Sequence, residues 1–523
     1  MFGHSFNFEN LFIFELANNH NGLLEHGVKI INEMADIVQR KKIRGAIKLQ
    51  FRDLDTFIHP AYRENKENKH ITRFLSTRMS EEQFTQLVEE TRRRGLVTIC
   101  TPFDESSVDK IERLGIEVIK IGSCSAQDWP LLERIAETGK PVICSTGGLT
   151  LKEIDRIVSF FQHRGVHFAL MHCVAVYPTP NDQLSLNQIV LMRNRYPALT
   201  IGFSTHEEPD NLNAVRVAYA KGARIFEKHV GVSTDTISLN TYSATPAQVE
   251  AWIGAYLDAR DSCGAAHQRT ISQKETDDLV SLMRGVYAKK EIKKGAKILR
   301  GDVFFAMPLV ENQLFSGHWR KGMVADQDYA RDVPINASLH NGYRTKKDII
   351  YSTIHTVKGM LNEARIPLGH EFSVELSHHY GIERFDKIGC TIIECISREY
   401  AKKIMVQLPD QWNPTHYHKQ KDESFHVLAG EVEVEIEGQK KKLTPGDTLW
   451  IPCGVWHAFG THTGAIIEEI STADSPGDSF YIDRNIARMP RDARKTYLRN
   501  WGRHQFDDLE EQESTDLLAP SFV

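Results

Sequence analysis

The sequence has 523 residues, of which 41% are hydrophobic and 25% charged, and it carries a formal net charge of −5. This length allows roughly two to four domains of about 100–200 residues each, and the hydrophobic share can fill ordinary cores, which excludes a wholly disordered chain. Because no basic excess is present to neutralise a phosphate backbone, nucleic acid is excluded as the principal partner.

The N-terminal segment and the cysteines are typical of a cytoplasmic protein. The segment MFGHSFNFENLFIFELANNHNG has no cationic start, and Glu15 interrupts its apolar stretch, unlike in a signal peptide. No apolar run approaches the roughly 20 residues of a membrane span. The 8 cysteines include no CxxC pair, which favours free thiols in a reducing compartment. We therefore expect a cytoplasmic protein that makes no contact with a membrane.

From Leu11 to about His229 the chain alternates short apolar runs with amphipathic helical stretches. In the stretch TLKEIDRIVSFFQHRG, Thr150 and Glu153 form a capping-box pattern, and Gly165 is a helix stop. Eight apolar runs separated by about one helix each predict a closed (β/α)₈ TIM barrel: LFIFELA, RGAIKLQF, LVTICTPF, IEVIKIGS, KPVICSTG, HFALMHCV, ALTIGFST and ARIFEKHV. An open doubly wound sheet is the competing interpretation, but no GxGxxG follows the first run.

Two further regions follow the predicted barrel. From about Arg284, VYAKKEIKKGAKILRGDVFFAMPLV combines short strands with turn glycines, which indicates a small β module. From about Tyr351, period-2 runs such as GEVEVEIEG predict a β sandwich or small β-barrel. We predict four segments: the TIM barrel, the small β module, the second β domain and a charged tail, at residues 1–280, 281–348, 349–500 and 501–523.

Three lysines lie inside apolar runs of the predicted barrel: Lys48, Lys120 and Lys228. A lysine in a buried strand is costly unless an anion or carboxylate pairs with it. Barrel enzymes place their chemistry where strands end, so the lysines predict a phosphate or carboxylate pocket together with other polar residues at strand ends: Gln50, Thr101, Ser123 and Ser145. The alternative is that each lysine extends outward between the helices to reach water.

Two histidines indicate a metal site on the same rim. His206 ends the seventh run and His229 the eighth, and Glu15 of the first run lies across the barrel closure. Two imidazoles with oxygen ligands can hold a divalent cation and leave positions open for substrate. A hydrogen-bonded structural role is the alternative for either histidine alone.

Eight motifs in order resemble the N-acetylneuraminate (sialic acid) synthase family over residues 10–275: FELANNHNG, AIKLQ, CTPFD, VIKIGS, CSTGG, HCVAVYPTP, IGFSTHE and FEKHV. The β module that follows is similar to the small antifreeze-like (SAF) β-clip domain of that family. The resemblance implies condensation of phosphoenolpyruvate with an aldose to give a 3-deoxy-2-ulosonic acid and phosphate. It also implies a homodimer in which the β-clip caps the barrel of the partner.

The resemblance also implies roles for individual residues. A divalent metal, Mn²⁺ or Mg²⁺, would sit on His206 and His229 and polarise the aldehyde while C3 of phosphoenolpyruvate attacks it. Glu15 and Gln50 match positions near the metal water and the sugar and, with Lys120, are the expected catalytic residues. The expected phosphoenolpyruvate ligands are Lys48, Thr101, Lys120, Ser123, Ser145 and Ser204.

The sequence departs from this family at several positions. Ala175 replaces an asparagine, Ser125 replaces a glutamate, and Leu239-Asn240 replaces an Asp-His pair. In LFSGHWRKGM, the arginine that reaches the partner's sugar pocket has no clear counterpart. We therefore expect an acceptor other than N-acetylmannosamine, for example one without an N-acetyl group.

The C-terminal region contains a second set of metal-ligand residue types: His416, His418, Glu423 and His457. Alternation along a strand puts His416 and His418 on one face. Three imidazoles and one carboxylate suit Fe, Mn, Ni or Zn. The pattern HxH-x4-E-x6-G followed by G-x5-PxG-xx-H resembles the cupin superfamily, which implies that all four residues bind a metal.

The function of this cupin is less constrained, because cupin names a scaffold rather than a reaction. The segment NPTHYHKQKDESFHVLAGEVEVEIEG is similar to cupins of the sugar isomerase type, and Lys419 and Glu433 are candidates for moving protons in the lumen. We predict an enzyme of surface-polysaccharide sugar biosynthesis whose cupin binds, isomerises or epimerises a related sugar. A dioxygenase and a non-catalytic carbohydrate-sensing module are alternatives for the cupin, and a Schiff-base aldolase using Lys120 or Lys48 is the alternative for the barrel.

Overall fold

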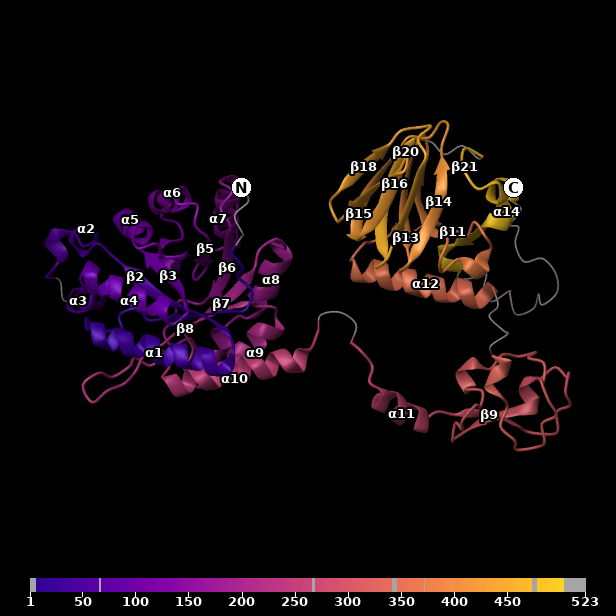
Figure 1. Cartoon of the computed structure of the whole chain (residues 1–523), viewed down its shortest axis with the longest axis horizontal. Helices are drawn as coiled ribbons and strands as arrows, with labels where there is room; N and C mark the ends of the chain where they lie inside the picture. The colour runs from indigo at the N-terminus through magenta and orange to yellow at the C-terminus, as the bar shows by residue number, and fades with distance from the viewer. Residues whose placement is uncertain are drawn as a thin grey trace. The chain divides into compact units, whose positions relative to one another are not determined.

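The computed structural model describes residues 6–64, 67–265, 269–340, 346–370, 372–472 and 477–502. The chain divides into two compact units, Met1–Thr270 and Ile271–Val523, and each is described by itself (Figure 1). The charged tail predicted for residues 501–523 lies outside the described residues from position 503 onward. No helix in the described part of the chain is long and apolar enough to span a membrane.

The first unit is a closed barrel of eight parallel strands (Figure 1). β1 pairs with β2 on one side and with β8 on the other, so the sheet has no free edge. This confirms the predicted TIM barrel and excludes the open sheet. The strands are β1 Leu11–Glu15, β2 Arg44–Phe51, β3 Val97–Pro102, β4 Val118–Ile121, β5 Val142–Ser145, β6 Phe168–Cys173, β7 Ile201–Thr205 and β8 Ile225–His229.

Helices follow the strands and cover the outside of the barrel. The predicted capping box is present at α7, where the Thr150 side chain accepts from the Glu153 backbone N–H, and Gly165 adopts a φ of +66° just after the helix. The helices of this unit are α1 Leu24–Lys41, α2 Leu54–Phe57, α3 Lys69–Ser76, α4 Glu81–Arg93, α5 Glu105–Arg113, α6 Trp129–Glu137, α7 Leu151–His163, α8 Asn187–Arg195, α9 Leu212–Ala220 and α10 Pro246–Cys263.

Alternation along each strand produces two apolar layers in this unit. The larger layer lies between strands and helices and includes Phe12, Ile47 and Phe226. A smaller cluster comes from the opposite strand faces and includes Ile13 and Ile99. Since successive strand residues point to opposite faces, the smaller cluster fills the lumen. The lumen is thus a packed interior with room for polar groups only toward the carboxyl ends of the strands.

The second unit begins with α11 Gln273–Ser281 and a small β-rich segment. β9 Gly285–Ala288 and β10 Val303–Ala306 form an antiparallel pair. Isolated bridges such as Ile292 to Tyr329 tie the surrounding turns together. A separate small core, which includes Val286, Met323 and Tyr329, holds this segment.

The C-terminal part of the second unit is a β sandwich of a seven-stranded sheet (β18-β15-β20-β13-β12-β11-β22) and a five-stranded sheet (β17-β16-β19-β14-β21) (Figure 1). Side chains of both sheets share one apolar cluster, which includes Phe425 and Phe459. The outer face of the larger sheet is covered by α12 Lys346–Glu363, through contacts that include Val357 and Val406. The strands lie at Ser373–Ser377, Cys390–Ser397, Tyr400–Gln407, Gln411–Tyr417, Glu423–Gly430, Val432–Ile436, Gln439–Leu443, Thr448–Ile451, His457–Thr461, Ala465–Thr472, Phe480–Tyr481 and Lys495–Arg499 (β11 to β22 in chain order), with short helices α13 Arg484–Arg488 and α14 Arg491–Arg494.

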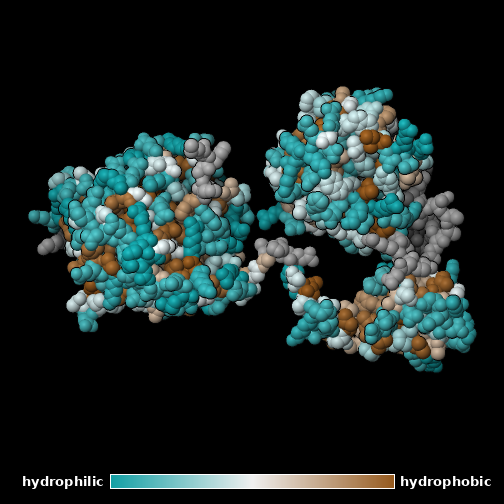
Figure 2. Space-filling view, in the orientation of Figure 1, coloured by the Kyte–Doolittle hydropathy of each residue, from teal (hydrophilic) through white to brown (hydrophobic). Residues whose placement is uncertain are grey.

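On the displayed face of each unit, hydrophilic and hydrophobic residues are interspersed (Figure 2).

Candidate functional site

A polar layer lies above the apolar cluster of the barrel lumen. Its side chains alternate in phase with the lumen residues Ile13, Ala46 and Ile99 on their strands. Most of the predicted barrel residues belong to this layer and are buried: Glu15, Lys48, Thr101, Lys120, Ser145, Ser204 and His206. The closed barrel therefore brings residues from six strands into one small volume.

Two lysines of this layer are held by carboxylates of the chain itself. Lys48 forms an ion pair with Glu15 and a second one, at 2.8 Å between Nζ and Oε1, with Glu227. Lys120 Nζ donates to Ser145 Oγ at 2.6 Å and lies 3.7 Å from Glu227 Oε2. The lysines thus face the lumen as predicted, but the chain supplies two carboxylate partners that were not expected.

Burial and charge pairing act in opposite directions on these groups. Burial alone would favour the neutral amine, but Glu15 and Glu227 outweigh it and raise the pKa of Lys48. Burial likewise would raise the pKa of Glu227, yet Lys120 and Lys48 lower it well below its ordinary value. Burial raises the pKa of Glu15 and lowers that of Lys120. Of the two lysines in this layer, Lys120 is therefore the one whose protonated form is stabilised less by the surrounding carboxylates.

Glu227 is the central residue that sequence reasoning missed. It contacts both lysines and accepts a hydrogen bond from Ser204 Oγ at 2.9 Å. A usable signal was present, because Glu227 lies two residues before His229 and period-2 alternation puts both on one strand face.

The same alternation shows that the prediction for Lys228 is wrong. Lys228 lies on the outward face of β8 next to Phe226, which packs in the layer between strands and helices. Its Nζ is 2.8 Å from Glu207 Oε1 and 5.6 Å from the ring centroid of Trp252 on α10. Lys228 therefore neither lines the lumen nor reaches solvent: it is fully buried in an ion pair in the helix layer.

His206 and His229 lie together at the rim, with ring centroids 5.4 Å apart. His206 Nδ1 donates to the Val174 carbonyl oxygen at 2.9 Å, which leaves Nε2 for a ligand. Burial lowers the pKa of each imidazole to about 3, so both are neutral near pH 7, the form that binds metals. Tyr177 and Tyr242 pack against the two rings at 4.1 and 5.1 Å. The pair fits a divalent cation that takes its remaining ligands from substrate or water.

The remaining predicted residues of the barrel, Gln50 and Ser123, accept hydrogen bonds from the chain itself, whereas Thr101 of the polar layer is unpaired. Gln50 Oε1 accepts a hydrogen bond from Arg52 at 2.9 Å. Ser123 Oγ accepts from the Gly147 backbone N–H at 2.9 Å. Thr101 Oγ1 is buried and has no hydrogen-bond partner among the described residues. Unpaired donors of this kind are available to a ligand.

The four predicted cupin residues converge between the two sheets of the sandwich. One ligand atom from each of His416, His418, Glu423 and His457 lies within 4.8 Å of the others, and all four residues are buried. Within the described ranges this is the one group of three or more His, Cys, Asp or Glu side chains that is so placed. His416 and His457 are register partners on β14 and β19. The carboxylate of the set comes from β15, where Glu423 Oε1 is 2.8 Å from His457 Nε2.

The hydrogen bonds of the three imidazoles suit metal binding. Nδ1 of His416, His418 and His457 lies 2.9, 2.7 and 3.0 Å from a backbone carbonyl oxygen. Because a carbonyl can only accept, each Nδ1 carries the proton and each Nε2 has a free lone pair. Burial also lowers the pKa of His416 well below its ordinary value, which keeps it neutral. The set is thus arranged to hold a divalent transition metal.

Comparison with known proteins agrees with the division of the chain into a barrel and a cupin. The NeuB family model matches residues 41–268, and a cupin domain model matches residues 403–470. The protein MJ1065 of Methanocaldococcus jannaschii is 30% identical over 292 residues, which cover 55% of this chain and 82% of that relative. This chain belongs to the NeuB family.

Two further relatives are similar to parts of this chain that include the barrel. An N-acetylneuraminate-9-phosphate synthase of Drosophila melanogaster is 31% identical over 42% of this chain and 59% of its own length. A solved structure from Chromobacterium violaceum, of a protein assigned by its name to spore coat polysaccharide biosynthesis (protein E), is 46% identical with a TM-score of 0.62 and covers 63% of this chain and 99% of that one.

The structure corrects the proton-transfer candidates in the cupin of this NeuB-family chain. Lys419 is exposed and lies over the Phe480 ring, and Glu433 alternates with Val432 and Val434, which fill the sandwich core. Neither therefore faces the metal-ligand set. The buried Lys421 does, with Nζ 2.6 Å from Glu423 Oε2.

Lys421 belongs to a buried charged network. Its Nζ also lies 3.0 Å from Glu469 Oε1, and Lys403 Nζ approaches the same oxygen to 3.6 Å. Four charged side chains with exposures of 7% or less thus meet beside the imidazoles: Lys403, Lys421, Glu423 and Glu469. Burying so many charges is costly for a purely structural sandwich.

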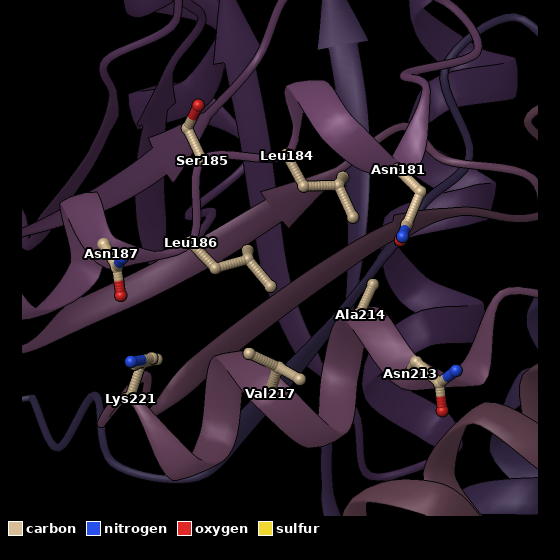
Figure 3. A pocket seen from close by; sticks show the side chains of 9 residues that line it. All are labelled: Asn181, Leu184, Ser185, Leu186, Asn187, Asn213, Ala214, Val217 and Lys221. Atoms are coloured by element: carbon tan, nitrogen blue, oxygen red, sulfur yellow. The ribbon is translucent and has the colours of Figure 1, made fainter.

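A surface pocket on the outer wall of the NeuB-family barrel is separate from both sites. It lies between the segment around α8 and helix α9, where Leu184, Leu186 and Val217 line it (Figure 3). Lys221 is its one titratable lining residue, and none of the predicted site residues lines it. Its position in the helix layer offers no route to the lumen chemistry.

Proposed function

We propose that the barrel condenses phosphoenolpyruvate with an aldose to give a 3-deoxy-2-ulosonic acid and phosphate. The observation that carries this proposal is a row of register partners across three strands: His229 on β8, Glu15 on β1 and Lys48 on β2. An imidazole, a carboxylate and an ammonium group side by side suit a reaction that needs a metal, a proton-handling group and an anion anchor.

In this proposal the lumen lysines bind the phosphate and carboxylate of phosphoenolpyruvate. Lys120 is the better anchor, because its nearest carboxylate oxygen is 3.7 Å away, whereas Lys48 is held more closely by two glutamates. Glu227 orients both ammonium groups before the substrate arrives, which is electrostatic preorganisation. The hydroxyl groups of Thr101, Ser123 and Ser145 would donate to the same anion, and Ser204, whose hydroxyl donates to Glu227, would line the same pocket.

A divalent cation, Mn²⁺ or Mg²⁺, held by His206 and His229 would polarise the aldehyde of the acceptor. C3 of phosphoenolpyruvate forms the new bond to that carbon, water adds to C2, and phosphate leaves by C–O cleavage. Glu15, whose pKa burial raises, would hold or release a proton at the rim. Gln50 would contact the sugar.

The acceptor and cellular setting follow from the relatives and from the departures in sequence. Ser125, Ala175 and Asn240 argue against N-acetylmannosamine as the acceptor. We propose a role in surface-polysaccharide biosynthesis in the cytoplasm by a homodimer in which the small β module at 281–348 acts as a SAF domain and caps the partner's barrel. We also propose that the barrel domain spans residues 1–280 and the cupin domain residues 349–500.

The cupin would bind Fe, Mn, Ni or Zn through its three histidines and Glu423, and would bind and isomerise or epimerise a related sugar. The support is Lys421, which lies against Glu423 and Glu469 and could pass a proton to or from a bound sugar. A sensing module would need only the ligand pocket, not this costly buried network.

A second candidate for the barrel is a Schiff-base aldolase, which the lowered pKa of Lys120 favours. The test is to incubate the protein with Mn²⁺, phosphoenolpyruvate and a panel of aldoses and to measure released phosphate, followed by mass spectrometry of the product. We expect release with at least one aldose and its loss on adding a chelator. Chelator-resistant turnover with a borohydride-trapped lysine adduct would instead establish the aldolase.

A further inference from the structure

A guanidinium group is clamped between two aromatic rings at the mouth of the barrel. Cζ of Arg52 lies 4.0 Å from the ring centroid of Phe74 and 3.6 Å from that of Phe103. Arg52 comes directly after β2, Phe103 directly after β3, and Phe74 belongs to α3. Three separate elements therefore fix the plane of this cation, which is the preorganisation that arginine uses in ligand recognition.

The hydrogen-bonding edge of Arg52 is incompletely used. Its Nη2 donates to Gln50 Oε1 at 2.9 Å, while Nε is buried and has no partner within the described residues. No carboxylate of the described chain lies within ion-pair distance of the guanidinium. Burial lowers the pKa of Arg52 to about 10, which still leaves it charged near pH 7. Phenyl rings attract a cation but cannot accept its hydrogen bonds in the way an anion does.

The position of Arg52 relates it to the acceptor rather than to phosphoenolpyruvate. Lys48, Gln50 and Arg52 succeed one another at two-residue steps toward the mouth, and the contact between Gln50 and Arg52 shows that they share one side. Two residues advance a strand by about 6.6 Å, so the backbone of Arg52 lies about 13 Å outward from that of Lys48. This distance leaves room for a small sugar between the two side chains.

We propose that Arg52 recognises an anionic substituent, a carboxylate or a phosphate, on the acceptor aldose at the end remote from its aldehyde. This inference rests on the proposed condensation and names the class of acceptor: an acidic aldose. The guanidinium plane presents parallel N–H groups that match both anions. A purely structural role for Arg52 between Phe74 and Phe103 would not explain why its buried Nε has no hydrogen-bond partner among the described residues.

The test compares binding of three matched aldoses to the full chain by calorimetry, in the presence of Mn²⁺ and without phosphoenolpyruvate so that no condensation occurs: a neutral hexose, its 6-phosphate and its uronic acid. We expect the wild type to bind at least one acidic member more tightly than the neutral one. Arg52→Met should weaken binding of that acidic aldose by about 10- to 100-fold, with Arg52→Lys in between. The two acidic members distinguish phosphate from carboxylate.

Arg78→Met is the matched control, since Arg78 is exposed and paired with Asp55, and it should bind like the wild type. Equal binding of neutral and acidic aldoses by the wild type, or an unchanged preference in Arg52→Met, overturns the inference. A loss of phosphoenolpyruvate affinity in Arg52→Met as large as the loss for the aldose also overturns it. Phosphate release, measured separately, reports on the condensation itself, so its failure is distinguishable from failure of this assignment.

Discussion

Glu15 and His229 are register partners across the seam where the first strand of the barrel meets the last. Glu15 is also the register partner of Lys48, with which it forms an ion pair. If a sheet of this strand order were open between β1 and β8, these strands would be its opposite edges, and Glu15 and His229 would lie far apart. Barrel closure therefore creates the proposed site.

Replacing Lys120 by alanine should lower phosphate release by about 10²–10³-fold, because one preorganised donor to the reacting anion is lost. Steady-state kinetics on the folded variant measures this. Lys228→Met is the matched comparison: it should retain turnover but lower the free energy of unfolding by about 3–5 kcal/mol, since it leaves Glu207 as a buried unpaired charge. Full turnover by Lys120→Ala would remove this lysine from the site.

Glu227→Gln should reduce turnover as strongly as Lys120→Ala, although Glu227 was not predicted from sequence. Its charge orients both Lys48 and Lys120, so the amide leaves Lys120 without its carboxylate partner. We expect a higher KM for phosphoenolpyruvate by about tenfold or more. Glu433→Gln, on the half-buried outer face of a cupin strand, is the control and should have wild-type kinetics. Unchanged KM in Glu227→Gln would contradict the preorganisation role.

The barrel histidines should make the metal-free protein less stable in acid. His206 and His229 have a folded pKa of about 3, below the ordinary value of about 6.5 for an unfolded chain. Their contribution to stability is thus fully present above pH 6.5 and is lost as the pH falls toward 3, by about 1.4 kcal/mol per pH unit for each histidine. Urea unfolding between pH 7 and 4.5, in a chelator, should show a shallower loss for His206→Asn than for the wild type. Parallel curves for the two proteins would refute the prediction.

The cupin ligands should govern bound transition metal independently of the barrel. His416→Asn or His457→Asn should lower the metal content of the purified protein by tenfold or more, measured by inductively coupled plasma mass spectrometry. His206→Asn should leave this metal bound, because that residue belongs to the other unit. Equal metal loss in all three variants would argue against two separate sites.

Lys421 and Lys419 form a matched pair for the proposed proton transfer. Lys421→Met should abolish exchange of a sugar C–H hydrogen with deuterated water, followed by NMR over an aldose panel, while the metal stays bound. Lys419→Met should behave like the wild type, because Lys419 is exposed. Exchange that survives in Lys421→Met would leave the cupin without its proposed proton-transfer group.

The spacing of hydrophobic residues along the sequence was enough to predict much of the fold of this protein. Apolar runs separated by helical stretches were enough to predict the closed barrel, and the positions within and at the ends of these runs were enough to identify Lys48, Lys120 and His229. Two-residue alternation along the eighth strand, which was not used for the barrel, would also have turned Lys228 outward and Glu227 inward. The HxH pattern and its spacing to Glu423 and His457 were enough to predict a convergent set, because strand alternation is a local property.

Only the tertiary structure decided which groups meet. The carboxylates beside Lys48, the pairing of Lys421 with Glu469, and the clamp of Phe74 and Phe103 on Arg52 join segments that are distant in the chain. Register between strands and the closure of the barrel set these contacts, and both depend on packing of the whole domain rather than on any local run of residues. A sequence determines which side chains face inward, whereas the fold selects their partners.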